Sequence, residues 1–363
     1  MLISAEKLQA FVETILRAAG SGAEEARTVA AHLVEANLTG HDSHGISLIP
    51  EYLRNIKVGN VRPNEVGSLV RRDGSILVYD GNLGYGQVVA KLATDLAIEA
   101  AKASGLALLA LRNCHHIGRI GSYGEQCAAQ GLVAVQFVNA VGNRPRVAPH
   151  GGRDARLPTN PVCIAVPATE GKPAVILDMA TSKIAQGKVR IARNSGIPVG
   201  EGFLLDKDGE PTTDPQVMFD EVPGAILPFG EHKGYGLSLM CEILAGAFTG
   251  GPTIQPANPQ RGASVNGMLM IVFDPARTAS LDGARREIDA LVDYVTASPP
   301  REPGMPVLVP GDPERATRAS RNKNGIPVDD GTWARLLEAA GGLGVAYRMD
   351  EPAKTGPARG RIG

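Results

Sequence analysis

One short stretch decides the class of fold: residues 106–111 read LALLAL, six apolar residues in unbroken succession. A run this short and this apolar is typical of a strand buried within a sheet. Helical patterns precede it over residues 86–104 and follow it over residues 121–131. Further strands are predicted over residues 75–81, 133–138, 162–166, 174–177 and 268–273. Strands alternating with helices indicate an α/β fold.

The two ends of the chain have a different pattern of apolar residues from this middle part. Helical spacing dominates the first sixty residues and returns towards the end of the chain. We therefore predict four regions, with the third packing against the first: residues 1–68, a helical part with a polar turn; 69–280, a mixed α/β domain that binds ligands; 281–345, C-terminal helices; 346–363, a basic, glycine-rich tail without fixed structure.

Composition excludes several classes of function. The net charge of −1 and the 4% of aromatic residues give no reason to expect a nucleic acid or an anionic membrane as partner. The sequence has no apolar run long enough to span a membrane, and its N-terminus lacks the features of a signal peptide. The four cysteines show no CxxC spacing, which disfavours structural zinc and disulfides. We expect a cytoplasmic protein.

Residues 40–45 (GHDSHG) place two imidazoles, a carboxylate and a hydroxyl in one glycine-bounded turn after a helical pattern. Histidine exchanges protons near neutral pH, and a neighbouring hydroxyl can hold a polar substrate atom. His44 and Ser43 are therefore candidates for acid/base chemistry. The alternative is a polar turn in which the Asp and Ser only cap a helix.

Two further clusters strengthen the functional interpretation. Residues 114–119 read CHHIGR and residues 231–236 read EHKGYG, so the three clusters hold five of the seven histidines. His116 follows the buried strand, at the end of a strand where ligands bind in α/β sheets. Metal binding by the histidines stays open at this point, although no HExxH motif is present.

Residues 174–182 suggest a phosphate site. A strand ends in the carboxylate of Asp178 and runs into small and hydroxyl-bearing residues, which we interpret as a helix start with exposed N–H groups. The alternative for Asp178 is a helix N-cap. The fingerprints GxGxxG in a strand–turn–helix context, GxxxxGK[ST] and GxSxG are all missing from the sequence, which excludes the standard Rossmann, P-loop and α/β-hydrolase motifs.

The motifs together, in this order and spacing, resemble the malate/L-lactate dehydrogenase family, which is also called sulfolactate dehydrogenase-like. The matching segments are DSHG (42–45), NCHHIG (113–118), TNP (159–161), DMA (178–180) with GK (187–188), HKG (232–234) with Gly236, and PG (310–311) with GIP (325–327). The likeness covers about residues 5–340. It implies a non-Rossmann, mixed-sheet domain that binds NAD or NADP, a helical domain built from both chain ends, and a homodimer.

The resemblance also implies roles for particular residues. His44 would be the acid/base, with Ser43 and His116 binding the reacting oxygen or orienting His44, and Asp178 lying where substrate and nicotinamide meet. The implied cofactor-binding residues are Asp178, Met179, Ala180, Thr181, Ser182, Lys188, His232, Lys233, Gly234, Gly311, Asp312 and Pro313. Thr159 and Asn160 would contact the substrate.

One position departs from the family pattern. Many relatives carry an arginine four residues after the motif histidine, where it can hold a substrate carboxylate, and here that residue is Leu48. A carboxylate in a water-excluded site needs a cation elsewhere. Arg119 is the first candidate for this clamp, and Arg146 is the second.

We therefore expect a dehydrogenase that transfers a hydride between NAD(P) and a 2-hydroxy/2-oxo carboxylic acid, a small-molecule substrate of the malate or lactate type. The alternatives within enzymes are a cyclic imino acid reductase and a ureidoglycolate-type dehydrogenase. A cofactor-binding protein without catalysis and a metal-binding protein are the alternatives from other classes.

Overall fold

The computed structural model describes residues 1–347, and its chain forms two compact units. Residues 1–58 and the chain from residue 314 onward make one, here called the terminal unit, and residues 59–313 make the other, called the sheet unit. The chain thus leaves the terminal unit once and returns to it once.

Helices build the terminal unit. They are α1 (Ala5–Ala18), α2 (Ala23–Leu38), α3 (Ile49–Lys57), α9 (Asp312–Asn324, entering from the sheet unit) and α10 (Asp330–Gly341), with 3-10 turns at Asp42–His44 and Ile46–Leu48. A two-stranded sheet joins the ends of the chain, since β1 (Leu2–Ile3) pairs antiparallel with β12 (Ile326–Pro327). Residues 46–57 are therefore a 3-10 turn followed by α3 rather than one continuous helix.

Local signals explain why α1 forms where it does. The Ser4 side chain accepts a hydrogen bond from the backbone N–H of Lys7, which satisfies one of the free donors at the helix start. Apolar residues at helical spacing then bury one face of the helix: Leu8, Phe11, Val12, Ile15 and Leu16. Helix α1 packs against α2.

A seven-stranded mixed sheet forms the middle of the sheet unit, in the order β2-β3-β4-β11-β5-β6-β7. Its strands are β2 (Ser68–Asp73), β3 (Ile76–Asp80), β4 (Leu106–His115), β5 (Val133–Val141), β6 (Val162–Val166), β7 (Val175–Met179) and β11 (Val265–Phe273). Only β3 and β4 pair in parallel. The pairing makes β3, β4, β5 and β7 point the same way, so their carboxyl ends share one edge of the sheet.

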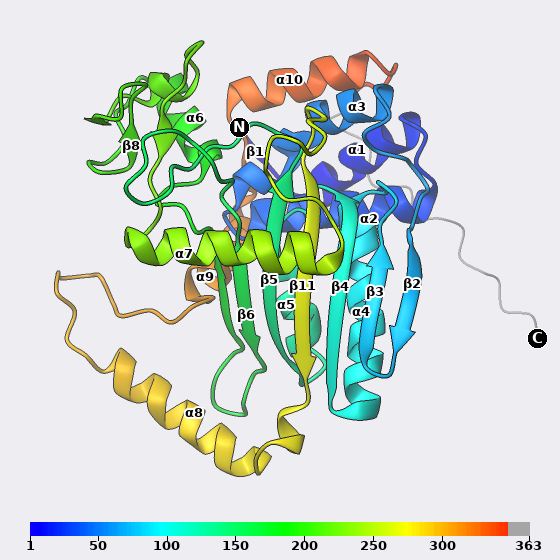
Figure 1. Cartoon of the computed structure of the whole chain (residues 1–363), viewed down its shortest axis with the longest axis vertical. Helices are drawn as coiled ribbons and strands as arrows, with labels where there is room; N and C mark the ends of the chain where they lie inside the picture. The colour runs from blue at the N-terminus through cyan, green and yellow to red at the C-terminus, as the bar shows by residue number, and fades with distance from the viewer. Residues whose placement is uncertain (348–363) are drawn as a thin grey trace, which may run out of the picture. The chain divides into compact units, whose positions relative to one another are not determined.

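Helices cover both faces of this sheet (Figure 1). α4 (Gly86–Ser104) and α5 (Gly121–Ala128) lie behind it, while α7 (His232–Cys241) crosses in front and continues as a π-helical turn at Glu242–Gly246 and a 3-10 turn at Ala247–Thr249. The core between sheet and helices includes the buried residues Leu77, Leu109, Leu111, Met268 and Met270.

Smaller elements complete the sheet unit. They are a three-stranded sheet of β8 (Leu204–Leu205), β9 (Pro211–Thr212) and β10 (Ala225–Ile226), α6 (Gln186–Ser195), α8 (Leu281–Thr296), and 3-10 turns at Pro215–Met218 and Pro275–Arg277. Figure 1 shows α8 beyond the lower end of the strands. The prediction drew a boundary at residue 281, but α8 belongs to the sheet unit and the chain re-enters the terminal unit at Glu314. Most of the predicted tail, residues 348–363, lies outside the described residues.

Candidate functional site

The HDSH turn forms a single 3-10 turn, Asp42–His44, directly after α2. The amide of Asn37, on the last turn of α2, holds both sides of it. Its Nδ2 donates to Asp42 Oδ1 at 2.6 Å, and its Oδ1 accepts from the backbone N–H of Ile46 at 2.9 Å. Asn37 is only 4% exposed, so these bonds are shielded from water and fix the path of the turn.

A cation from the far end of the chain completes the anchoring. Arg321 on α9 donates from both terminal nitrogens to the two carboxylate oxygens of Asp42, at 2.7 and 3.0 Å. This fork-to-carboxylate geometry adds orientation as well as attraction. Gly45 is needed beside it, because a Cβ at this position would lie 2.1 Å from Asn37 Oδ1. The side chains of Asn37 and Arg321, together with the missing Cβ at Gly45, therefore set the conformation of the turn.

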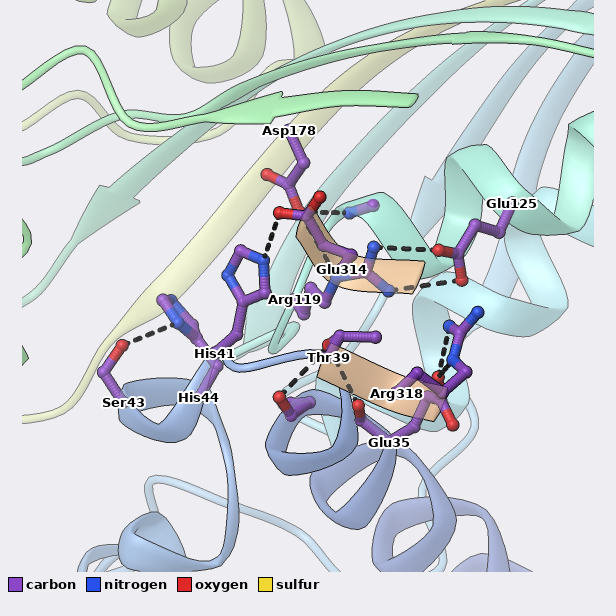
Figure 2. A network of polar contacts seen from close by, with 12 residues as sticks. Glu35, Thr39, His41, Ser43, His44, Arg119, Glu125, Asp178, Glu314 and Arg318 are labelled. Carbon is purple, nitrogen blue, oxygen red and sulfur yellow. Dashed lines mark hydrogen bonds and ion pairs between the residues drawn. The ribbon is translucent and has the colours of Figure 1, made fainter. Parts of the chain in front are cut away.

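Ser43 and His44 form a hydrogen-bonded pair on this anchored turn (Figure 2). The Ser43 hydroxyl and His44 Nδ1 lie 3.1 Å apart, and both residues are half-buried. Whichever atom carries the hydrogen, the hydroxyl occupies Nδ1 and fixes the plane of the ring.

The two adjacent histidines at the end of β4 differ in their surroundings. His115 is 1% exposed, and burial lowers its pKa from 6.5 to about 3. It is therefore neutral at physiological pH and part of the core, with its ring at a right angle to that of Tyr85. His116 is half-buried, so of the two it is the one that can meet a ligand.

A glycine turn supports this histidine pair. Gly84 O accepts from the backbone N–H of His115, and a Cβ on Gly86 would lie 2.2 Å from His115 O and 2.5 Å from His116 O. The glycines at positions 81, 84 and 86 do not have the spacing of a Rossmann fingerprint. Their role here is close backbone packing beneath the strand end.

Asp178 lies in β7 and has well-defined neighbours. Its Oδ2 accepts from the backbone N–H of Gly121 at 2.8 Å and lies 3.8 Å from Arg119 Nε. Arg119 also binds Glu125 through both terminal nitrogens, at 2.9 and 3.2 Å (Figure 2). A Cβ on Gly121 would lie 2.7 Å from Asp178 Oδ2, so only glycine allows this approach.

Arg119 was the first candidate for holding a substrate carboxylate. Its side chain is 1% exposed and lies between the carboxylates of Glu125 and Asp178. A guanidinium in this position already balances two buried or half-buried negative charges. The clamp stays a prediction, but these neighbours favour a different role, which is to hold Asp178 in place.

The predicted helix start after Asp178 is wrong. The strand β7 continues to Met179, and α6 begins only at Gln186. Asp178 is therefore not an N-cap. The N–H of Thr181 donates to Thr159 O, and its hydroxyl donates to the carbonyls of Thr159 and Asn160. Thr181 is fully buried, so this segment does not expose the row of N–H groups that the prediction required.

The segments expected to hold the cofactor nevertheless converge. The backbone N–H of Phe229 donates to Thr181 O, and that of Gly234 donates to Phe229 O at the start of α7. On the other side, Ile176 N donates to Pro310 O, which brings the Gly311-Asp312-Pro313 segment beside β7. The other residues expected to hold the cofactor differ in their exposure. Three are exposed (Lys188, His232 and Lys233), two are half-buried (Met179 and Ala180), and Ser182 is buried.

Asn160, predicted to contact substrate, is instead the centre of a buried polar network. Its Nδ2 donates to Glu242 Oε1 at 2.9 Å and to Ser238 O at 3.1 Å, and its Oδ1 accepts from Ala140 N at 3.3 Å. Asn160 is 0% exposed. With both amide ends bonded inside the fold, it braces the Thr-Asn-Pro segment, and the half-buried Thr159 is the member that stays accessible.

Glu242 lies in the π-helical turn that follows α7 and receives three donors: Asn160 Nδ2, Ile254 N at 2.8 Å and Asn139 Nδ2 at 3.4 Å. Burial raises its pKa, and the three hydrogen bonds oppose that rise. π-helical turns often occur at functional sites. The network continues through Asn139 and Asn266, whose Oδ1 accepts from Ile117 N next to His116.

Arg146, the second clamp candidate, is half-buried and lies in the segment that pairs with residues 157 and 226. Within residues 1–347 no three His, Cys, Asp or Glu side chains gather as metal ligands would, and the four cysteines are buried and free. In the same range no helix has the length and apolar character needed to cross a membrane.

Comparison with known proteins settles the family. Residues 3–337 match the family model described as malate/L-lactate dehydrogenase. The chain belongs to this family, as its motifs predicted. It is 44% identical over 343 residues to hydroxycarboxylate dehydrogenase B of Escherichia coli (strain K12), covering 94% of each chain.

Solved structures show the same fold. Sulfolactate dehydrogenase from Methanocaldococcus jannaschii matches with a TM-score of 0.84 at 36% identity, covering 96% of this chain and 98% of that one. Δ1-Piperideine-2-carboxylate reductase from Pseudomonas syringae pv. tomato matches with a TM-score of 0.82 at 33% identity, covering 94% of this chain and all of the other. The mixed α/β fold with a mixed sheet is thus confirmed.

Several residues of the site were not identified from the sequence. Arg321 gave no signal, because its partner Asp42 is 279 positions away. Glu125 was not singled out in the sequence, and its partner Arg119 is identified only by the structure. Glu242 did carry a signal, since it is the one charged residue in the otherwise apolar stretch 237–248. Acids in such a stretch are rarely buried without a partner.

Proposed function

We propose that this chain transfers a hydride between NAD(P) and a 2-hydroxy/2-oxo carboxylic acid, with His44 as the acid/base. The observation that carries the proposal is the Ser43–His44 pair on a turn locked by Asn37 and Arg321. An acid/base must stand in one orientation through many turnovers, and this anchoring provides it. The dehydrogenases among the matched relatives support the reaction class.

The proton chemistry follows from the geometry of His44. When a carbonyl is reduced, its oxygen becomes an alkoxide and takes a proton; in the reverse direction the hydroxyl loses one. His44 Nε2 supplies or accepts that proton while Ser43 keeps Nδ1 engaged. His116 and Ser43 help to hold the reacting oxygen. His115, next to His116 in the chain, is neutral and adds no competing charge.

The residues also fit an anionic dinucleotide. Lys188, Lys233 and His232 are exposed on the segments expected to hold the cofactor, and two cations with an imidazole suit a pyrophosphate. The bound nicotinamide would supply the hydride donor or acceptor. Asp178, held by Gly121 and Arg119, would set one wall of the site where substrate and nicotinamide meet.

For the substrate carboxylate the candidates are Arg119 and Arg146. Arg119 is engaged with Glu125 and Asp178, and Arg146 is half-buried in a loop of the same unit. Replacing Arg146 by Met should raise KM for the acid and leave cofactor binding unchanged. A homodimer and a cytoplasmic location remain predictions from the resemblance and the composition; light scattering tests the first.

The decisive experiment replaces His44 by Ala. Turnover should fall by roughly 10²–10⁴-fold, the usual contribution of general acid–base catalysis, while nicotinamide fluorescence still reports cofactor binding. The matched control is His41→Ala, which removes an imidazole from the same turn and its 3.3 Å contact with Glu314 but leaves the Ser43–His44 pair in place. Near-normal turnover in the His44 variant would overturn the proposal.

The alternative is reduction of a cyclic imino acid, favoured by the likeness to a piperideine-2-carboxylate reductase. Its C=N bond beside a carboxylate could use the same His44. A panel of 2-oxo acids and piperideine-2-carboxylate, each with NADH and with NADPH, separates the two. The better substrate class by kcat/KM decides.

A further inference from the structure

A cavity of about 390 Å³ opens in the sheet unit, at the carboxyl ends of β3, β4 and β5. None of its walls belongs to the residues to which we assign the reaction or the cofactor. The lining residues that matter are Arg62, Asn82, Leu83, Asn113 and Arg261. Its volume lies towards the lower end of the range that is usual for small-molecule sites.

Strained backbone is concentrated around this cavity. Among residues 1–347, five non-glycine residues have a positive φ, and three of them line it: Asn82 (48°), Leu83 (61°) and Asn113 (54°). For a leucine this conformation is unusual and costs on the order of 1 kcal/mol. Such residues persist where the surroundings over-determine them, and they gather at ligand sites.

Hydrogen bonds hold the strained residues in place. Leu83 N donates to Asn113 O at 2.8 Å, Asn82 N to Asp80 Oδ1 at 3.0 Å, and Asn113 Nδ2 to Asp80 Oδ2 at 3.0 Å. The carboxylate of Asp80 also pairs with Arg112 Nε at 2.9 Å, so its charge is balanced inside the wall. The cavity is thus a preformed, rigid shape.

The charge of the cavity is positive. Arg62 donates to Asn82 Oδ1 at 2.9 Å, which turns its guanidinium to the lining residues, and Asn82 in turn donates to Glu65. Within residues 1–347 the guanidinium of Arg261 makes no hydrogen bond or ion pair with another side chain. The floor is apolar, a small cluster of Leu83, Val141 and Val265.

We propose that this cavity is a second ligand site, which binds a small organic carboxylate. The guanidiniums of Arg62 and Arg261 hold the carboxylate, and the short carbon chain lies on the apolar floor. The wall residue Asn113 is in β4, the strand that ends at His115, and Gly84 next to Leu83 bonds the N–H of His115. The site therefore shares β4 and the Leu83–Gly84 backbone with the segment that carries His115 and His116, without including either histidine.

The test measures binding of succinate by calorimetry to wild-type protein and to Arg62→Gln, Arg261→Gln and the double variant. Both arginines are exposed, so the variants should fold. Each single change should weaken binding by roughly tenfold or more, the usual scale for a lost charged hydrogen bond, and the double variant should show none. The control is Arg71→Gln, an exposed arginine on β2 outside the cavity, which should bind as wild type does.

Three outcomes would overturn the proposal: no binding to wild type, equal binding to all variants, or inorganic phosphate binding as tightly as succinate, which would show a site for charge alone. Succinate held at the proposed catalytic site instead would be insensitive to Arg62 and Arg261, so the second outcome identifies it. The measurement needs no turnover, so a failure of the proposed reaction would leave it intact.

Discussion

The neutral state of His115 gives a prediction with a definite size. Burial lowers its pKa from 6.5 to about 3, so below pH 6.5 the unfolded chain binds a proton that the native protein does not. The stability that the neutral His115 contributes to the folded state is therefore complete above pH 6.5 and is lost progressively as the pH falls below it. Each pH unit inside that window costs about 1.36 kcal/mol, so lowering the pH from 6.5 to about 4 should remove roughly 3 kcal/mol through this group alone.

The perturbation that isolates this effect is His115→Gln, which deletes the titrating group. Other ionisable groups titrate alike in both proteins, so the difference between their unfolding free energies cancels them. Urea unfolding followed by circular dichroism, at pH about 7, 5.5 and 4, gives that difference. The advantage of wild type over the variant should shrink by roughly 3 kcal/mol towards acid. A difference that stays constant across this range would refute the neutral, buried assignment of His115.

Two more predictions concern the buried polar contacts. Glu242→Gln places an amide N–H₂ among the donors from Asn160, Asn139 and Ile254, and should lower the free energy of unfolding by roughly 2–3 kcal/mol; an unchanged denaturation midpoint would contradict the network. Gly45→Ala places a Cβ 2.1 Å from the oxygen of the Asn37 amide and should lower the free energy of unfolding by roughly 2–4 kcal/mol. It should also lower turnover, because the turn that carries His44 shifts. A variant as stable and active as wild type would show that the turn is not held as described.

Periodicity predicted elements wherever local sequence decides the conformation. The helix expected over residues 86–104 is α4 to the residue, ending at Gly105 in the left-handed conformation that glycine favours. The strand expected over residues 162–166 is β6. Each segment has a strong hydrophobic pattern and a clear residue signal at its end, so its local sequence and its tertiary contacts favour the same conformation.

Long-range pairing set the limits of prediction. No local signal shows that β11 inserts between β4 and β5, because their positions in the chain are far apart. The segment after Asp178 has the composition of a helix start, yet it stays extended because Thr181 bonds to Thr159 and Asn160. In the same way, Arg119 looked like a ligand-binding cation until its two carboxylate neighbours were placed beside it. His44 was recognisable because its partner Ser43 is adjacent in sequence.

The bond between Asp42 and Arg321 has a consequence for how the protein is made. The ribosome releases the HDSH turn early, but the guanidinium that anchors it is synthesised 279 residues later. The sheet unit, residues 59–313, is complete before that arginine exists and can fold first, as earlier domains generally do during synthesis. The turn that carries His44 is therefore among the last parts of the molecule to be fixed, and nascent chains stopped short of α9 hold a finished sheet and a turn that lacks its anchor.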